Sequence, residues 1–245
     1  MKNWNHILDK LRATINNLGI DSFHVLEELV PIEEQMDFFK YFDDLKDRKV
    51  RFERDTEIEM LFSSDVSIER KKESLAVLAS IPDVKAYRAI ETYHSNPLEP
   101  ELRTWSAIAL LGSRIGLDSE FSGKPQIYIS SGLGGHDKKL RFFTLFITNS
   151  QENLTEVQKK LVEEEFRFQL ENANVEIEAF EIKDNYFTLL FLFPFKTDVR
   201  AILQSAIEEC NKYGNFLDTK FIFTNVKIFS DEEIQKLLDN DLKID

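Results

Sequence analysis

The segment of residues 130 to 139 holds the densest group of side chains and glycines that could bind an anion. It reads Ser-Ser-Gly-Leu-Gly-Gly-His-Asp-Lys-Lys and contains three of the eight glycines in the chain. Glycines let successive backbone N–H groups converge on an anion, and lysines would add positive charge. The candidate ligand-binding residues are therefore Gly134, Gly135, His136, Lys138 and Lys139. A ligand there would be an anionic metabolite or a nucleotide.

The same segment also fits a simple connection between two strands. Glycine and polar clusters between apolar runs are typical of hairpin turns. The pattern lacks the Gly-Lys-Ser/Thr ending and the strand-to-helix context of a phosphate-binding loop. Both interpretations, a ligand loop and a plain hairpin, stay open at this point.

Other groupings with catalytic chemistry are sparse. No two of the four histidines have the spacing of metal ligands. They are His6, His24, His94 and His136. The single cysteine, Cys210, follows Glu208 and Glu209, and these acidic neighbours disfavour a reactive thiolate. We therefore expect no catalytic residue, no metal site and no cofactor, and we predict that the protein is not an enzyme.

The first 120 residues have the apolar spacing of successive helices. The pattern predicts one helix over residues 4 to 18 and a second one that starts at Asp21 or Ser22 and runs to Val30. The clearest stretch, residues 67 to 117, predicts three helices of similar length with Pro or Asp at the turns. We predict an all-α domain over residues 1 to 120.

Part of this stretch resembles a known repeat family. Pro100-Glu101-Leu102-Arg103, followed by Ala107 to Gly112, is similar to the second half of a HEAT-like repeat, and residues 74 to 89 resemble the preceding helix pair. The resemblance covers roughly 50 residues. It implies a helical surface of the kind that binds other proteins, and it implies no catalytic residue.

The composition changes after residue 120, and 14 of the 21 phenylalanines lie in residues 124 to 245. Apart from a short strand at 126 to 130, this half reads strand, helix, strand, strand, helix, strand, which is the ferredoxin-like order. Residues 141 to 147 and 186 to 193 are continuous apolar runs, as central strands require. We predict an α+β protein in which a ferredoxin-like domain with an extra N-terminal strand spans residues 124 to 245.

Such a sheet has helices on one face, so the other face is exposed or covered by something else. Alternation along the two central strands predicts a core set of Phe143, Leu145, Ile147, Phe187, Leu189, Phe191 and Phe193. The other set is Leu140, Phe142, Thr144, Phe146, Tyr186, Thr188, Leu190 and Leu192. This second set would pack on the helical domain, the extra strand or a second copy of the chain, or it would bind a partner or small ligand. The candidate interface residues are Phe142, Phe146, Tyr186 and Leu190.

Charge and composition restrict the partners. The 245 residues carry 31 basic and 44 acidic side chains, a net charge of −13, and both halves are acidic. Because the chain has no basic run, we expect no nucleic-acid partner. We also expect no membrane partner, and with one cysteine and no apolar leader we predict a cytoplasmic location.

These observations favour a non-enzymatic cytoplasmic adaptor or regulatory protein, with another protein or a second copy of itself as the partner. The alternative is a small-molecule sensor that uses residues 130 to 139. An enzyme would need titratable side chains that converge in a cleft, which a sequence alone does not reveal.

Overall fold

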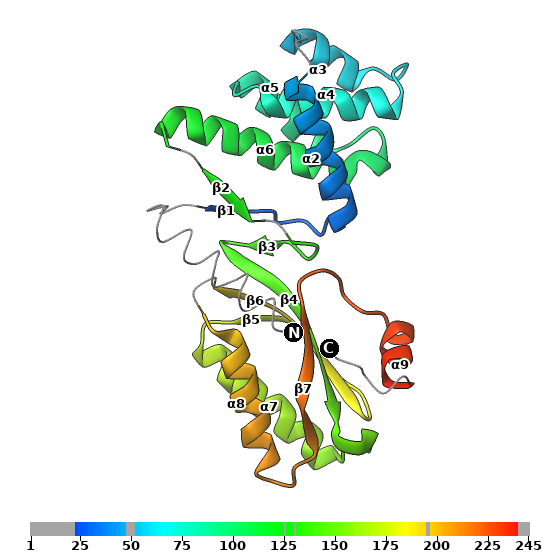
Figure 1. Cartoon of the computed structure of the whole chain (residues 1–245), viewed down its shortest axis with the longest axis vertical. Coiled ribbons are helices and arrows are strands. Elements are labelled where there is room, and N and C mark those ends of the chain that lie inside the picture. Colours follow the sequence, from blue (N-terminus) through cyan, green and yellow to red (C-terminus); the bar gives the residue numbers. More distant parts are fainter. Residues whose placement is uncertain (1–22, 48–51, 125, 130, 195–196, 240–245) are drawn as a thin grey trace. The chain divides into compact units, whose positions relative to one another are not determined.

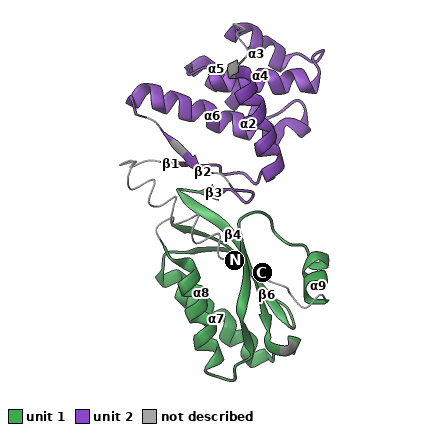
Figure 2. Cartoon of the chain, in the orientation of Figure 1, with its two compact units in different colours: residues 1–19, 135–245 green, residues 20–134 purple. Residues whose placement is uncertain are grey.

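A computed structural model describes residues 23–47, 52–124, 126–129, 131–194 and 197–239 (Figure 1). Two compact units are present (Figure 2). We call residues 20–134 the helical unit and residues 135–245 the sheet unit. The division falls after Gly134 and not near residue 120, because residues 126–129 belong with the helices. The predicted helix over residues 4 to 18 lies outside the described residues.

Five α-helices make up most of the helical unit as far as it is described. The α4 and α5 helices begin at caps that the sequence supplies: Ser67 accepts from the Arg70 N–H and Asp83 from the Lys85 and Ala86 N–H groups. The elements are β1 (Phe23–Val25), α2 (Ile32–Asp47), α3 (Arg54–Phe62), α4 (Ile68–Ser80), α5 (Val84–Ser95), the 3-10 turn η1 (Pro100–Leu102), α6 (Arg103–Ser122) and β2 (Ile127–Ile129). The three helices predicted between residues 67 and 117 are thus present, while the HEAT-like resemblance stays a prediction.

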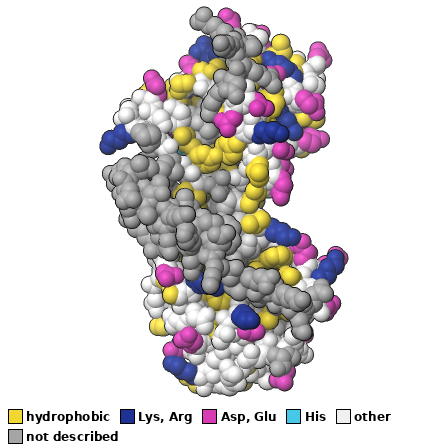
Figure 3. Space-filling model, in the orientation of Figure 1, with side chains coloured by type: hydrophobic (Ala, Val, Ile, Leu, Met, Phe, Trp, Pro, Cys, Tyr) yellow, Lys and Arg dark blue, Asp and Glu magenta, His cyan; other side chains and the backbone are white. Residues whose placement is uncertain are grey.

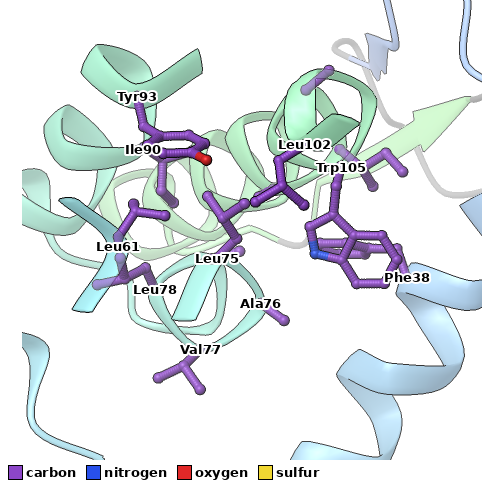
Figure 4. Packing of buried hydrophobic residues seen from close by; sticks show 14 of the residues in the cluster. Phe38, Leu61, Leu75, Ala76, Val77, Leu78, Ile90, Tyr93, Leu102 and Trp105 are labelled. Atoms are coloured by element: carbon purple, nitrogen blue, oxygen red, sulfur yellow. The ribbon is translucent and has the colours of Figure 1, made fainter. Parts of the chain in front are cut away.

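The core of the helical unit lies where α2, α4, α5 and α6 meet (Figure 4). Phe38 of α2 lies against Trp105 of α6, with the ring centroids 5.1 Å apart. The Trp105 Nε1–H donates to the Lys72 carbonyl of α4 at 3.1 Å, so the one polar atom of the indole is satisfied. Burial of the apolar faces of four helices in one cluster holds this unit together.

Two ion pairs, each with one buried and one half-buried member, join the helices around this core. Lys71 is fully buried, and its Nζ lies 2.5 Å from Oε1 of Glu99, whose Oε2 accepts from the Tyr93 hydroxyl at 2.5 Å. In the second pair, the buried Glu57 accepts from Arg70 at 2.8 Å and from the Ser74 hydroxyl at 2.9 Å. Removing one member of such a pair leaves an uncompensated charge in the core, so these pairs fix how the helices fit together.

A short pair of parallel strands completes the helical unit. β1 pairs with β2 in the register Phe23↔Ile127 to Val25↔Ile129, and the Leu26 N–H donates to the Ile129 carbonyl at 3.2 Å. The helix predicted from Asp21 or Ser22 to Val30 is therefore wrong over its described part. The strand at 126 to 130, expected in the second sheet, pairs here instead.

The sheet unit confirms the predicted α+β class and the order of its elements. Its four long strands are antiparallel in the spatial order β5-β6-β4-β7. The first and third of them along the chain, β4 and β6, are therefore central. Helices α7 and α8 cover one face (Figure 1). The elements are β3 (Gly135–His136), β4 (Lys139–Thr148), the turn η2 (Asn149–Gln151), α7 (Glu156–Asn172), β5 (Glu176–Ile182), β6 (Tyr186–Pro194), α8 (Val199–Asn211), β7 (Leu217–Thr224) and α9 (Asp231–Asp239).

The two central strands align differently from the sequence-based prediction. Phe146 is paired with Phe187 and Phe142 with Phe191, so the even-numbered residues of β4 share a face with the odd-numbered residues of β6. This is the face under the helices, since the Phe146 ring lies 4.9 Å from Phe166 of α7. Phe142 and Phe146 are each 1% exposed. Their assignment to an interface is therefore wrong, because they belong to the helix-covered core.

The chain itself covers part of the opposite face. Tyr186 and Leu190 lie on this side, together with Phe143, whose ring is 5.8 Å from that of Phe229. The Tyr186 hydroxyl donates to Asp231 at the start of α9 at 3.3 Å. Leu190 remains half-buried. The α9 helix thus occupies a position that sequence analysis left to another domain, another copy or a ligand.

The position of Phe146 can be tested with a matched pair of substitutions. Phe146→Glu places a carboxylate among the Phe166, Phe187 and Phe221 rings and should cost more than about 4 kcal/mol of unfolding free energy. Phe168→Glu, at a residue that is 61% exposed, should change it by about 0.5 kcal/mol or less. Denaturant unfolding followed by circular dichroism measures both. A stable Phe146→Glu variant would contradict this burial and would show that Phe146 lies on an exposed surface.

The Lys71–Glu99 pair predicts sensitivity to acid. Burial alone would raise the pKa of Glu99, but the hydrogen bonds from Lys71 and Tyr93 outweigh it and lower this pKa below its usual 4.5. A carboxyl with a lowered folded-state pKa stabilises the protein above its unfolded pKa, and this contribution is lost as pH falls through the folded value. We expect the unfolding free energy of the native chain to decrease below about pH 4.5, and that of Glu99→Gln to decrease less. Parallel acid profiles for the two proteins would refute the contribution of this pair.

Candidate functional site

The Gly-rich segment forms a hairpin in the structure. Asp137 and Lys138 have φ angles of 47° and 61° and connect β3 to β4, with His136 paired to Lys139. Two residues with positive φ between paired residues form the type I′ turn that suits the twist of a hairpin. The geometry of residues 135 to 139 therefore supports the plain hairpin and not the ligand loop.

The predicted ligand-binding residues do not converge on one point. Gly135 is paired with Leu140 inside the ladder, and Gly134 closes a turn in which its N–H donates to the Ser131 carbonyl at 3.2 Å. His136 and Lys138 are exposed at the hairpin, where His136 Nε2 lies 3.3 Å from an Asp137 carboxylate oxygen. Lys139 is paired with Glu176 at 3.3 Å. The glycines serve the backbone and form no cradle for an anion.

Gly134 has a structural role that sequence analysis missed. Its φ is +65°, and a Cβ at this position would lie 2.6 Å from the Glu28 carbonyl oxygen, 2.8 Å from that of Leu26 and 2.9 Å from that of Glu27. Real Cβ atoms do not approach backbone oxygens this closely, so only glycine fits without displacing the backbone. The segment around Gly134 therefore packs directly against residues 26–28.

A second contact fixes the same stretch. The Gln35 side chain at the start of α2 is buried, and its Nε2 donates to the Val30 carbonyl at 2.7 Å and to the Ser131 carbonyl at 3.1 Å. Residues 26–30 are thus held by β2 through Leu26, by Gly134, and by Gln35. This attachment determines where the Glu28 side chain lies.

Glu28 lies against His94 near the end of α5. The His94 Nε2 is 2.7 Å from Glu28 Oε1, and its Nδ1 is 2.9 Å from the Ser106 hydroxyl of α6. Ser106 is fully buried and donates its own proton to the Arg103 carbonyl at 2.8 Å. The Ser106 oxygen is therefore able to accept from the His94 Nδ1–H, while the His94 Nε2 faces the Glu28 carboxylate.

A cleft opens beside this pair, and we call it the His94 cleft. Its volume is about 160 Å³, and it lies between residues 25–28 and helices α5 and α6. Val25, Leu26, Ala107, Leu110 and Leu111 supply its apolar lining, and Glu27, Glu28, Tyr87, His94 and Arg114 its polar lining. Apolar walls with a few polar groups are the usual chemistry of a small-molecule site.

The polar groups of the lining differ in what they leave for a ligand. Burial, and after it the Glu91 carboxylate, raises the pKa of Tyr87, so its hydroxyl stays protonated at neutral pH and donates to Glu91 at 3.2 Å. Arg114 is exposed and makes no hydrogen bond or ion pair within the described residues. Glu28, in contrast, is already engaged by His94 and, at 3.5 Å, by Arg103. Arg114 is therefore the lining cation that these pairings leave without a carboxylate partner.

The remaining candidate groups lie elsewhere. His24 Nε2 is 3.2 Å from an Asp118 carboxylate oxygen, and His6 lies outside the described residues. Cys210 is buried in α8, where burial and then Glu165 and Glu209 raise its pKa to about 12. No group of three His, Cys, Asp or Glu side chains placed to hold a metal ion occurs among the described residues.

Comparisons with known proteins give matches only among solved structures. No family model matches, and neither does any curated protein sequence. One similar structure is a protein from Deinococcus radiodurans R1 assigned as a transposase, with 18% identity and a TM-score of 0.37 over 43% of this chain and 93% of that one. Another is a REP-associated tyrosine transposase bound to a REP hairpin, with 12% identity and a TM-score of 0.32 over 43% of this chain and 70% of that one.

These matches contradict several predictions made from the sequence. Both structures are of transposases, which are enzymes, and one is bound to a hairpin of nucleic acid. The predictions of a non-enzymatic adaptor, of a role through protein contacts, and of no nucleic-acid partner are therefore withdrawn. The sensor alternative at residues 130 to 139 is withdrawn with them, because the glycines form no cradle. At these TM-scores the likeness assigns no activity to this chain.

Charge and hydropathy of the described residues add two observations. Acidic and basic side chains are interspersed on the face seen in Figure 3. Among the described helices, none has the length and apolar character needed to cross a membrane.

Substitution of Gly134 tests whether its backbone contact shapes the cleft. Gly134→Ala should lower the unfolding free energy by about 3 kcal/mol, which combines the cost of positive φ with the clash against residues 26–28. Gly123→Ala is the matched control, because Gly123 has a φ of +63° and no atom within 4 Å of its Cβ position. It should lose only about 1 kcal/mol. Equal losses in denaturant unfolding would show that the contact contributes nothing.

Proposed function

We propose that the helical unit binds a small carboxylate with an aliphatic body in the His94 cleft. The observation that carries this proposal is Arg114, a cation without a partner in the described residues, at the rim of a cleft whose floor is apolar. A ligand carboxylate would supply the missing counter-charge, and its aliphatic part would lie on Leu110 and Leu111. A bidentate arginine–carboxylate pair is among the stronger polar contacts in proteins.

The charges around the cleft also support an anion. The Glu28 carboxylate is already engaged by the His94 ring at 2.7 Å, and Arg103 places a cation 3.5 Å from the same carboxylate oxygen. The Arg114 guanidinium remains as a donor, whereas the Tyr87 hydroxyl already donates to Glu91 at 3.2 Å. A cationic ligand would meet Arg114 without a free carboxylate opposite it, so it fits less well.

The volume limits the size of the ligand. A space of about 160 Å³ corresponds to about five water molecules at their share of liquid volume. A branched carboxylate of four or five carbons fits such a space. The apolar floor would favour this aliphatic body over inorganic phosphate.

Titration with isobutyrate tests the proposal. We expect chemical-shift changes in ¹H–¹⁵N spectra that are confined to residues 25–28, Tyr87, His94 and 107–114. Arg114→Gln should weaken this binding at least tenfold, because it removes the counter-charge and keeps the length of the side chain.

Arg167→Gln is the control for the change in net charge. Arg167 lies on α7 of the sheet unit, 3.0 Å from Glu163, and is not one of the residues that line the His94 cleft. Its variant should bind isobutyrate as the native chain does. The proposal fails if isobutyrate shifts no cleft resonance, or if inorganic phosphate binds as tightly as isobutyrate.

We further propose that the protein works in the reducing cytoplasm. The presence of a single cysteine, which is buried, supports this location.

A further inference from the structure

A second cleft lies at one end of the sheet unit, and we call it the amide cleft. It is formed where the segment after β4 approaches the loop between α8 and β7, and its volume is about 400 Å³. The side chains that matter for its chemistry are Asn149, Glu152, Asn153, Gln158, Asn215 and Phe216. The volume falls in the range of small-molecule sites.

The two walls of this cleft are joined by the fold. The Asn149 N–H donates to the Phe216 carbonyl at 2.8 Å, and the Asn149 side chain donates to the Asn215 carbonyl at 2.6 Å. Asn211, at the end of α8, holds the loop from behind with two hydrogen bonds to the Leu217 backbone of 2.8 and 2.9 Å. The cleft is therefore formed before any ligand arrives.

Several polar groups on these walls have unused hydrogen-bonding capacity. The side chains of Asn153 and Asn215 make no hydrogen bond within the described residues, and neither does the carboxylate of Glu152. Gln158 uses its Oε1 to accept from Thr155 at 2.9 Å, which leaves its Nε2 donors. The cleft thus presents donors and acceptors side by side.

The charge of the lining excludes two classes of ligand. Its described residues include one carboxylate and no Lys, Arg or His, so an anionic group would gain no counter-charge and would face Glu152. An apolar ligand would bury the amides of Asn153 and Asn215 without partners, which is costly. A neutral ligand with many hydroxyl groups satisfies both conditions, because each hydroxyl donates and accepts.

We propose that the amide cleft binds a ring that carries vicinal hydroxyl groups, as found in a saccharide or in the ribose of a nucleoside. Glu152 and the amides of Asn153 and Asn215 would bind the hydroxyls. The half-buried Phe216 ring, whose Cδ1 is 3.9 Å from the position a Cβ of residue 214 would take, would lie against the apolar face of the sugar. This site is separate from the His94 cleft and does not depend on the function proposed there.

Saturation-transfer NMR on the full chain tests this proposal with D-glucose, D-ribose, adenosine and 2′-deoxyadenosine as probes. We expect a signal from at least one ligand that has vicinal hydroxyls. Transfer to glucose or ribose assigns a saccharide site, and transfer to adenosine alone assigns a nucleoside site. The affinity for 2′-deoxyadenosine should be at least tenfold lower than for adenosine in the nucleoside case.

Two variants, each with a matched control, test whether the saturation-transfer signal comes from a ligand in the amide cleft. Asn215→Gly removes an amide and keeps the φ of 48°, and Asn174→Gly makes the same change at a φ of 58° outside the cleft. Phe216→Leu removes the ring, with the exposed Phe168→Leu as its control. We expect each cleft variant to weaken binding at least tenfold and each control to leave it unchanged. No transfer to any probe, equal loss in the controls or, in the nucleoside case, equal binding of 2′-deoxyadenosine and adenosine would overturn the proposal.

Discussion

In the helical unit, the position of residues 26–28 depends on one close backbone approach, that of Gly134 to the carbonyls of these residues. No side chain fits between these two segments, so their distance is set by the absence of a Cβ. The parallel pair β1–β2 fixes the same segment from one side, and Gln35 fixes it at Val30. Together they place Glu28 against His94, which is 66 residues away. The glycine that first suggested an anion site thus supports a different site.

In the sheet unit the corresponding constraint is the register of β4. This strand pairs with β6 along one edge and with β7 and β3 along the other, so its alignment decides which phenylalanines are buried. A shift of one residue would exchange the faces of β4 and bring Arg141 under the helices. Arg141 instead pairs with Glu178 of β5 on the opposite face, 2.5 Å away, which opposes such a shift.

The sequence was sufficient to predict the elements whose signal lies within one segment of the chain. Helices α4, α5 and α6 follow from apolar spacing with Pro and Asp at the turns, and the βαββαβ order follows from the continuous apolar runs of β4 and β6. The sequence was insufficient to predict the features that depend on contacts between two distant segments. The relative phase of β4 and β6 depends on their register, and apolar residues on both faces of β4 left no contrast to reveal it. Residues 23–25 have helical spacing but pair with β2, and no spacing rule connects Glu28 to His94.

Because the chain is acidic, it matters which of its charged side chains have no partner of opposite charge. With 44 acidic and 31 basic side chains, a cation at a buried or half-buried position readily finds a carboxylate, as Lys71 and Arg70 do. The exposed Arg114 at the His94 cleft makes no such pair within the described residues, although Glu27 and Glu28 line the same cleft. In the amide cleft the imbalance is reversed, because a carboxylate and two amides lie there without a cation. The two clefts therefore differ in the charge they leave unsatisfied, and each should select a ligand that the other rejects.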